Sequence, residues 1–460
     1  MEQEKKLSKF TRGYTFKIIF LAVMLLLLLI PLSMIRGLVN ERNRTADTAE
    51  ADIMEAWGSE LVAAGPFLII PGNRSEETRR STQNGDVIDI VKKPFSLIIA
   101  PEKLAIEADF KTEVRRRGIF SVPLFFGDLS LSGSFNPAKA ASSLAANEEI
   151  YWDQAEIVLV LSSQKGIRKI DRALWNGHSL FFQPGNRELN IVRRIDKIRV
   201  IDDFSTGGIF AVLPGAANTE SVFDISIAMQ GGRMVRLLPT GQDTRVTVST
   251  DWASPSFQGS FLPGKSTITD SGFSAEWDIS YLSRDIPLFW KHERGEGNRR
   301  DYSASLFGWN FFRSINTYSL NIRAVKYAIL FLIVPFLTLF LLEIFTKKNI
   351  HPVPYLLSGI ANIIFYLLLL SLSEQMIFHL AYLISALAVI ILLTLYSRSL
   401  LPSWNKSWYM GIVVTISYIL LYAVLNAESY ALLIGSIGAF TVVALVMYLT
   451  RKLNWYKTDE

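Results

Sequence analysis

The amino-acid sequence predicts an α-helical membrane protein with six transmembrane helices, one N-terminal and five C-terminal, and a large β-rich domain. Three observations predict this fold class. Six apolar runs have the length of membrane spans, residues 36–325 between the first two runs read as soluble protein, and Lys and Arg cluster at alternate loops. We expect the β-rich domain to be antiparallel and sandwich-like, because short strand patterns alternate with turn residues.

The first apolar run covers residues 18–35, and the other five crowd the last third of the chain. Each is close to the ~20 residues that an α-helix needs to cross a hydrocarbon layer of ~30 Å. The first run continues to Arg36 without a small-residue cleavage site, so we expect an uncleaved anchor. The later runs are residues 327–342, 353–372, 376–397, 408–425 and 430–449.

Lys and Arg residues indicate the orientation, because cytoplasmic loops carry an excess of both. They occur in the two tails and in the loops after the second and fourth runs, whereas loops 373–375 and 426–429 have none. We therefore expect both termini in the cytoplasm and the large domain on the other side. The predicted segments are a cytoplasmic tail (1–17), the anchor (18–35), an outer β-rich domain with one core or two subdomains (36–325), a five-helix bundle (326–450) and a cytoplasmic tail (451–460).

Residues 40–60 predict a helical stalk that leaves the membrane and is stopped by Gly58 and Gly65-Pro66. Strand patterns then dominate, and residues 137–149 are the best helix candidate within the domain. Leu-Pro turns begin at Leu213, Leu238 and Leu262, where we expect them to separate strands. The chain has no cysteine, so the domain must be stabilised by packing without disulfides.

One segment matches the phosphate-loop pattern G-x-x-x-x-G-K-[ST], namely Gly259–Ser266. That motif needs a helix directly after the loop, but the next residues read as a strand, so we interpret the match as chance. The four histidines have no metal-ligand spacing, and no G-x-S-x-G sequence is present. We therefore assign no catalytic, cofactor-binding or metal-binding residue and expect no enzyme activity. The net charge of +5 lies in the tails and inner loops, which argues against a nucleic-acid partner.

Five polar residues near the membrane edges are the candidate functional residues: Lys326, Glu343, His351, Glu374 and Glu428. Charges at membrane depth are rare and are often functional. The structural alternative is solvation at helix ends, and His351 stands before two prolines that suit a helix start. The functional alternatives are a proton-linked His351 and a polar site of the outer leaflet shared by Glu374 and Glu428, with Lys326 as a partner for either.

A series of short motifs stands in order along nearly the whole chain: residues 26–36, 39–42, 65–71, Trp252, 255–257, Gly259, 261–263, 271–273, Trp277, 326–330, 340–343, 351–352, 366–374, 425–429 and 431–435. In these motifs the chain resembles the CreD-type inner-membrane proteins, also called the cell envelope integrity or colicin-tolerance family. This resemblance implies a Gram-negative inner-membrane protein with a periplasmic domain, in a regulon linked to β-lactam and colicin responses. It implies no reaction, ligand or catalytic residue.

The function that we predict is support of envelope integrity, by non-catalytic binding or scaffolding through a periplasmic domain tethered to the membrane at both ends. Its partners would be the lipid bilayer and an envelope protein, a lipid or a cell-wall precursor. The alternative is a transporter or lipid-handling protein that uses a polar site in the C-terminal bundle. A membrane-bound hydrolase is a third class, and it would need a deep polar cleft in the outer domain.

Overall fold

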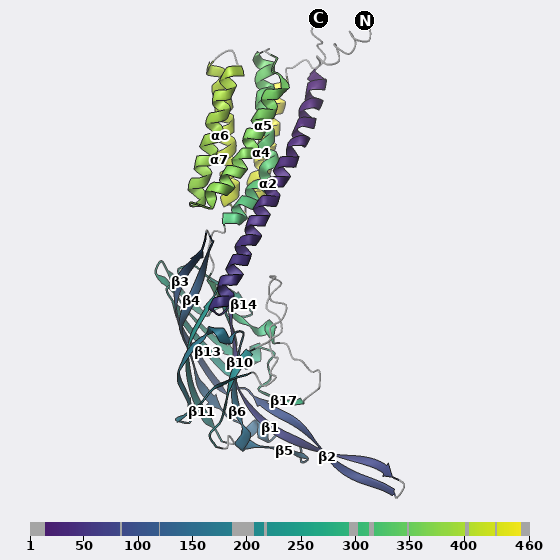
Figure 1. Cartoon of the computed structure of the whole chain (residues 1–460), viewed down its shortest axis with the longest axis vertical. Helices are drawn as coiled ribbons and strands as arrows, with labels where there is room; N and C mark the ends of the chain where they lie inside the picture. Colours follow the sequence, from purple (N-terminus) through teal and green to yellow (C-terminus); the bar gives the residue numbers. More distant parts are fainter. Residues whose placement is uncertain are drawn as a thin grey trace. The chain divides into compact units, whose positions relative to one another are not determined.

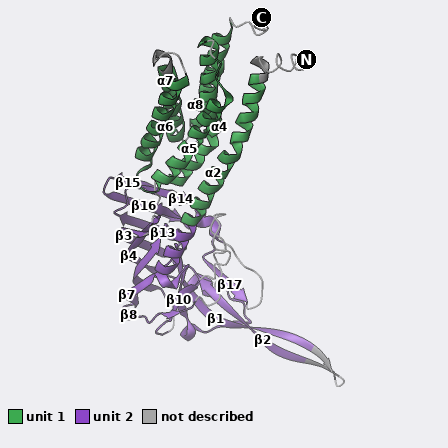
Figure 2. Cartoon of the chain, turned by 45° about the horizontal axis from the view of Figure 1, so that its top comes forward, with its two compact units in different colours: residues 1–46, 315–460 green, residues 47–314 purple. Residues whose placement is uncertain are grey.

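The computed structural model describes residues 14–82, 85–118, 120–185, 207–215, 219–293, 302–311, 317–346, 349–400, 404–427 and 430–451. The chain divides into two compact units (Figure 2). The membrane unit comprises residues 1–46 and 315–460, and the β unit comprises residues 47–314.

Within the described residues, six helices are long and apolar enough to cross a membrane, one N-terminal and five C-terminal as predicted. The first, α2, is longer than its apolar run because the polar stalk continues it without a break, as Figure 1 shows. It ends at Gly58, whose φ of +139° favours glycine. The helices are α2 (Tyr14–Trp57), α4 (Thr317–Thr346), α5 (Pro352–Ser373), α6 (Phe378–Leu400), α7 (Trp404–Asn426) and α8 (Ala431–Thr450).

The membrane unit has a single apolar core that is contributed mainly by α2 and α4 to α7. In α2, Met24, Leu28, Leu32, Ile35 and Val39 are buried at helical spacing and therefore form one face. Helix α8 contributes little, since Gly438 is its buried residue among those described.

The β unit contains two sheets that are mostly antiparallel, as predicted. Two strand pairs are parallel and were not predicted, namely β1 with β12 and β3 with β13. The first sheet has the order β14-β18-β12-β1-β6-β10-β9, and β2, β5 and β17 lie off this path. Its strands are β1 (Leu61–Thr82), β2 (Gly85–Ile99), β5 (Glu148–Ile150), β6 (Glu156–Leu161), β9 (Gln183–Pro184), β10 (Gly207–Val212), β12 (Met234–Leu238), β14 (Pro255–Gly259), β17 (Phe289–Glu293) and β18 (Phe307–Phe311).

The second sheet has the order β15-β16-β13-β3-β4-β11-β7-β8. Alternate residues of β13 are buried and exposed, which is the pattern of a sheet with one face on a core. Its strands are β3 (Lys103–Arg117), β4 (Phe120–Phe135), β7 (Ile167–Trp175), β8 (His178–Ser179), β11 (Ser221–Gly232), β13 (Asp243–Thr250), β15 (Lys265–Thr269) and β16 (Gly272–Ser280).

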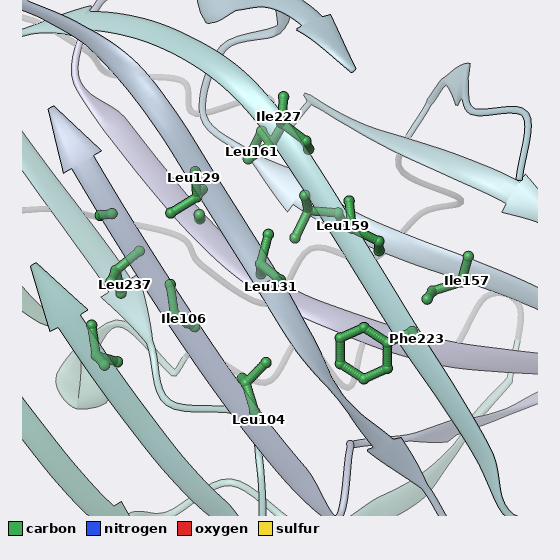
Figure 3. Close-up of a cluster of buried hydrophobic side chains, with 14 of the residues drawn as sticks. Leu104, Ile106, Leu129, Leu131, Ile157, Leu159, Leu161, Phe223, Ile227 and Leu237 are labelled. Carbon is green, nitrogen blue, oxygen red and sulfur yellow. The ribbon is translucent and has the colours of Figure 1, made fainter. Parts of the chain in front are cut away.

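The main core of the β unit lies between the two sheets, because side chains of both contribute to one buried cluster. Figure 3 shows part of it, where Leu159 and Leu237 of the first sheet lie near Ile106, Leu129 and Phe223 of the second. The opposite face of the first sheet is also buried, in a smaller cluster that includes Phe67 and Trp290.

Two local predictions changed. Residues 137–149 were expected to be helical, but only Ala138–Ala141 (α3) form a helix. Glu148–Ile150 pair with β1 instead, so tertiary pairing overrides the local preference. Gly65-Pro66 does not end the stalk. It lies inside β1, at a shift in the pairing register with β6.

Candidate functional site

The first polar cluster lies where α4 ends and α5 begins. Glu343 is 5% exposed, and its carboxylate forms an ion pair with Lys17 of α2. The Tyr355 hydroxyl donates to Glu343 Oε2 at 2.6 Å, and Lys17 Nζ donates to the Ile350 carbonyl at 2.8 Å. The interpretation of Glu343 as a solvated helix end is therefore wrong, because this carboxylate is buried and bonded on both oxygens.

The second polar cluster lies at the opposite ends of α4 and α5. Glu374 caps the C-terminus of α5 and accepts a hydrogen bond from the Tyr318 hydroxyl at 3.1 Å. Arg42 Nε of α2 lies 3.9 Å from Glu374 Oε1. Beneath them the buried Asn321 side chain donates to Ser373 Oγ at 2.9 Å. This cluster is more open to solvent, since the Arg42 side chain is 48% exposed.

The two clusters fix the position of α2 along the membrane unit. Lys17 and Arg42 are 25 positions apart in one helix, which corresponds to a rise of about 37 Å. This exceeds a hydrocarbon layer of ~30 Å by about 7 Å, so the two charged pairs fit the two interfaces of one bilayer. Because α2 is paired with carboxylates of the bundle at Lys17 and at Arg42, a slide of α2 by one turn would break both pairs.

A third polar group crosses the interior of the bundle. Pro335 of α4 has no N–H, so the Phe331 carbonyl loses its normal helical donor. Asn362 of α5 replaces it, with Nδ2 donating to the Phe331 carbonyl at 2.8 Å. The Tyr418 hydroxyl of α7 donates to Asn362 Oδ1 at 2.6 Å, and the Tyr382 hydroxyl of α6 donates to the Tyr418 carbonyl at 2.6 Å. One chain of hydrogen bonds therefore joins α4, α5, α7 and α6.

The interior group borders a very small cavity. Its volume is about 10 Å³, and its lining includes Pro335, Asn362, Ser417 and Tyr418. That space accommodates about one water molecule. It is far below the ~300–1,000 Å³ of ordinary small-molecule sites.

The remaining predicted residues are not brought together by the structure. Lys326 is exposed and forms no ion pair within the described ranges, and its Nζ lies 5.8 Å from the centre of the Tyr327 ring. His351 is the N-cap of α5, where its Nδ1 accepts from the Val353 N–H at 3.4 Å, as the capping alternative expects. Glu428 lies outside the described residues. A functional role for any of the five residues stays a prediction.

Sequence reasoning missed the partners of these carboxylates. Lys17 and Arg42 were considered only as topology signals or motif residues, although they supply both ion pairs. Asn362 was also missed, and its signal is an amide in the middle of an apolar run. Polar residues at that depth are expensive unless they are paired, so each one deserves a search for its partner.

The structure of residues 259–266 in the β unit does not match a phosphate-binding loop. β14 ends at Gly259 and β15 begins at Lys265, so the loop leads into a strand and lacks the helix that binds phosphate. Lys265 instead lies 3.8 Å from Glu276 of the neighbouring strand. Within the residues that the structure describes, no group of three or more His, Asp or Glu side chains is placed to hold a metal ion.

A larger cavity of about 420 Å³ lies in the β unit along the hairpin of β7 and β8. Ile170, Leu174 and Phe182 line it together with Asp171 and Arg172. No arrangement of a nucleophile and a base is evident among the residues of this lining.

Comparison with known proteins agrees with the architecture. The family described as "Inner membrane protein CreD" matches residues 13–456, which include all six membrane-capable helices and the whole β unit. The chain belongs to the CreD family. It is 27% identical to the inner membrane protein CreD of Escherichia coli (strain K12) over 440 residues, which cover 94% of this chain and 91% of that protein. As a member of the CreD family, this chain is an inner-membrane protein, and its described residues include one membrane-capable helix before the β-rich domain in the sequence and five after it.

Proposed function

We propose that this CreD-family protein supports the integrity of the cell envelope by non-catalytic binding or scaffolding. In this proposal the β unit lies in the periplasm, both chain termini lie in the cytoplasm, and the partner is an envelope protein, a lipid or a cell-wall precursor. The observation that carries the proposal is the double attachment. Helix α2 leads into the β unit and α4 leads out of it, so the domain is covalently held at both ends by membrane helices.

The charged clusters support a structural use of the bundle. Glu343 and Glu374 each pair with a basic residue of α2, and the buried Glu343 pair is the one that we expect to stabilise the position of the first tether. A transported ligand would compete for the same carboxylates, and the interior cavity is about the size of one water molecule.

The orientation is tested by labelling, because the natural chain has no cysteine. Ile268→Cys places a thiol on an exposed strand of the β unit, and Ser399→Cys places one at the end of α6. In cells with a permeabilised outer membrane, an impermeant maleimide should label Ile268→Cys before lysis and Ser399→Cys only after lysis. The reverse pattern would contradict the proposed orientation.

The double attachment is tested by cutting one tether. A protease site that replaces residues 312–316 can be cleaved after the full chain has assembled. The proposal expects cleavage to raise dye uptake through the envelope, although the β unit stays folded and attached through α2. The uncut chain is the control. Unchanged dye uptake after complete cleavage would contradict a scaffold that must be attached to the membrane at both ends.

The second candidate function is a transporter or lipid-handling protein, favoured by the partly open Glu374 cluster. Glu374→Gln separates the two functions. The Arg42–Glu374 pair is long, and its Arg42 side is 48% exposed, so we expect its loss to cost only ~0–1 kcal/mol of stability. A scaffold should therefore keep envelope protection, whereas a transporter that uses this carboxylate should lose it with the fold intact. The matched variant Glu428→Gln tests the same role for the second predicted residue of this site.

A further inference from the structure

The hairpin of β1 and β2 extends beyond the rest of the β unit as a two-stranded arm (Figure 1). β5 pairs with β1 only at Gly72–Arg74, and β17 pairs with β2 only from Phe95 onward. Beyond those points the two strands pair only with each other among the described strands. Ile88, Ile90 and Val91 are 54%, 68% and 43% exposed on this arm. A two-stranded ribbon by itself is only marginally stable in water. Its outer strand edges carry unpaired backbone N–H and C=O groups, so the arm can pair with a further strand.

The hydrogen bonds of Ser75 show which residues of β1 point their backbone N–H and C=O groups away from β2. The Ser75 N–H donates to the Asn147 carbonyl at 2.8 Å, and the Ser75 carbonyl accepts from Asn147 Nδ2 at 3.0 Å. The backbone groups of Ser75 therefore point away from β2. Because this direction alternates along an antiparallel strand, the N–H and C=O groups of Glu77 and Arg79 also point outward. No register shift interrupts the pairing of β1 with β2 over this stretch.

The charges along this edge are self-complementary. The sequence from residue 76 reads Glu-Glu-Thr-Arg-Arg, so an antiparallel copy places acidic residues opposite basic ones. We propose that this arm is a self-association surface, in which β1 pairs antiparallel with β1 of a second copy of this chain around Thr78. In that register Glu77 faces Arg79 of the second copy, and the two-fold symmetry repeats the pair.

Both residues are available for this contact. Glu77 and Arg79 are exposed and form no ion pair within the described part of the chain, whereas the adjacent Glu76 is already bonded to Lys93 at 2.6 Å. Their outward backbone groups also match, because residues that face each other in a hydrogen-bonded pair must both point across the edge.

The charge order selects this register over its neighbours. A shift of the pairing by two residues places Glu77 opposite Glu77, or Arg79 opposite Arg79, and like charges directly opposite each other are destabilising. A shift by one residue sets an outward-pointing group against an inward-pointing one. A lipid occupant fits the arm poorly, since Ile88 and Ile90 share their face with their cross-strand partners Arg79 and Glu77, whose charges are costly to bury in hydrocarbon.

Disulfide formation in the full-length chain tests the register, since the natural chain has no cysteine. Thr78 would lie in a non-hydrogen-bonded pair with its own copy, where Cα atoms are about 4.5 Å apart, within the ~4.4–6.8 Å that disulfides span. Thr78→Cys should therefore give a covalent dimer under mild oxidation in membranes. Asp89 is the partner of Thr78 on β2, so it would lie about three strand spacings, roughly 14 Å, from its own copy.

Asp89→Cys is accordingly the matched control, and Ile268→Cys on β15 controls for random collision. We expect at least about tenfold less covalent dimer from either control than from Thr78→Cys. Absence of the dimer from Thr78→Cys, or equal dimer from Asp89→Cys or Ile268→Cys, would overturn the proposal.

Charge reversal tests the pairing itself, with Thr78→Cys as the reporter. Glu77→Arg alone and Arg79→Glu alone each place like charges opposite each other twice, so each should reduce the covalent dimer about fivefold or more. Co-expression of the two reversed chains should restore a mixed dimer, because every arginine then faces a glutamate. Restoration in the mixture shows that each variant folds. A single reversal without effect, or a mixture without restoration, would contradict this interface.

Discussion

Glu148 is the central carboxylate of an ion-pair network where the arm of β1 and β2 joins the rest of the β unit. Its side chain is 2% exposed, yet it accepts hydrogen bonds from Arg74 Nε at 3.0 Å, Lys291 Nζ at 2.5 Å and the Ala145 N–H at 2.9 Å. Burial by itself would raise the pKa of this carboxyl, but the bonds from Lys291, Ala145 and Arg74 outweigh it and lower the pKa. Arg74 also reaches Glu293 at 2.5 Å, so the network joins β1, β5 and β17.

Replacement of this carboxylate should destabilise the β unit. Glu148→Gln leaves Arg74 and Lys291 without their shared anion, but both keep 27% exposure. We therefore expect a cost of about 2 kcal/mol, below the ~3–5 kcal/mol of a fully buried pair. The folded pKa is depressed, so the stabilisation is complete above the ordinary carboxyl pKa and disappears as pH falls through the folded value. Thermal unfolding should show a gap between natural chain and variant at pH 7 that shrinks below about pH 4.5. A gap that stays constant down to pH 3 would contradict this role.

At the level of single residues, the sequence singled out two carboxylates that the structure pairs, Glu343 and Glu374, but it did not predict their partners. Glu343 and Glu374 stood out because carboxylates are rare beside apolar runs. Lys17 could not be paired with Glu343 in advance, because 326 positions separate them and only helix packing brings them together. The same limit applies to Asn362 and the Phe331 carbonyl, whose contact depends on how α4 and α5 face each other.

At the level of elements, the membrane helices were predictable because apolar length is a local property of the sequence. The strands were partly predictable from alternation, as in β13, where every second residue is buried. The parallel pair of β1 with β12 was not, because a parallel neighbour is chosen by the whole topology. The helix expected at residues 137–149 failed for a related reason, since Glu148–Ile150 gain a strand partner.

The hydrogen bond from Asn362 of α5 to the Phe331 carbonyl of α4 should contribute to the stability of the bundle. Asn362→Leu removes the donor to the Phe331 carbonyl and the acceptor of the Tyr418 hydroxyl. Because each buried group left unsatisfied costs about 1–3 kcal/mol, we expect a loss of about 2–4 kcal/mol of stability in detergent. Pro335→Leu should reduce that loss, since residue 335 then supplies the N–H that the Phe331 carbonyl lacks.

The double variant Pro335→Leu with Asn362→Leu is therefore the informative measurement, as one corner of a double-mutant cycle. Ser385→Ala is the matched control, because the buried Ser385 hydroxyl donates to the Ala381 carbonyl of its own helix and has no further bond among the described residues. It should cost about 1 kcal/mol or less. Strict additivity of the Pro335 and Asn362 effects would show that the amide does not replace the missing helical donor.

At the level of the whole molecule, the chain has separate cores. Among the described residues, the buried core of the membrane unit comes from residues 24–39 and 320–425, whereas the buried clusters of the β unit come from residues 54–311. Helix α2 contributes to both, with its first part in one core and Met54 in the other. Because each unit buries its own apolar surface, each has the means to fold independently.

We therefore expect residues 47–314 to fold as an isolated domain, and the last turns of α2 to contribute to its stability. Met54 packs on Val122 and Leu124, and the Trp57 ring lies 3.7 Å from the Arg115 guanidinium. A fragment that begins at residue 60 loses these contacts and exposes Val122 and Leu124 to water. Burial of a large apolar side chain contributes ~1.5–3 kcal/mol, and the half-buried Trp57 contributes less. The fragment that begins at residue 60 should therefore be less stable than the 47–314 fragment by about 2–4 kcal/mol. Urea unfolding followed by circular dichroism measures the difference. Equal midpoints for the two fragments would show that α2 ends on the β unit without stabilising it, and an unfolded 47–314 fragment would show that its core requires the membrane helices.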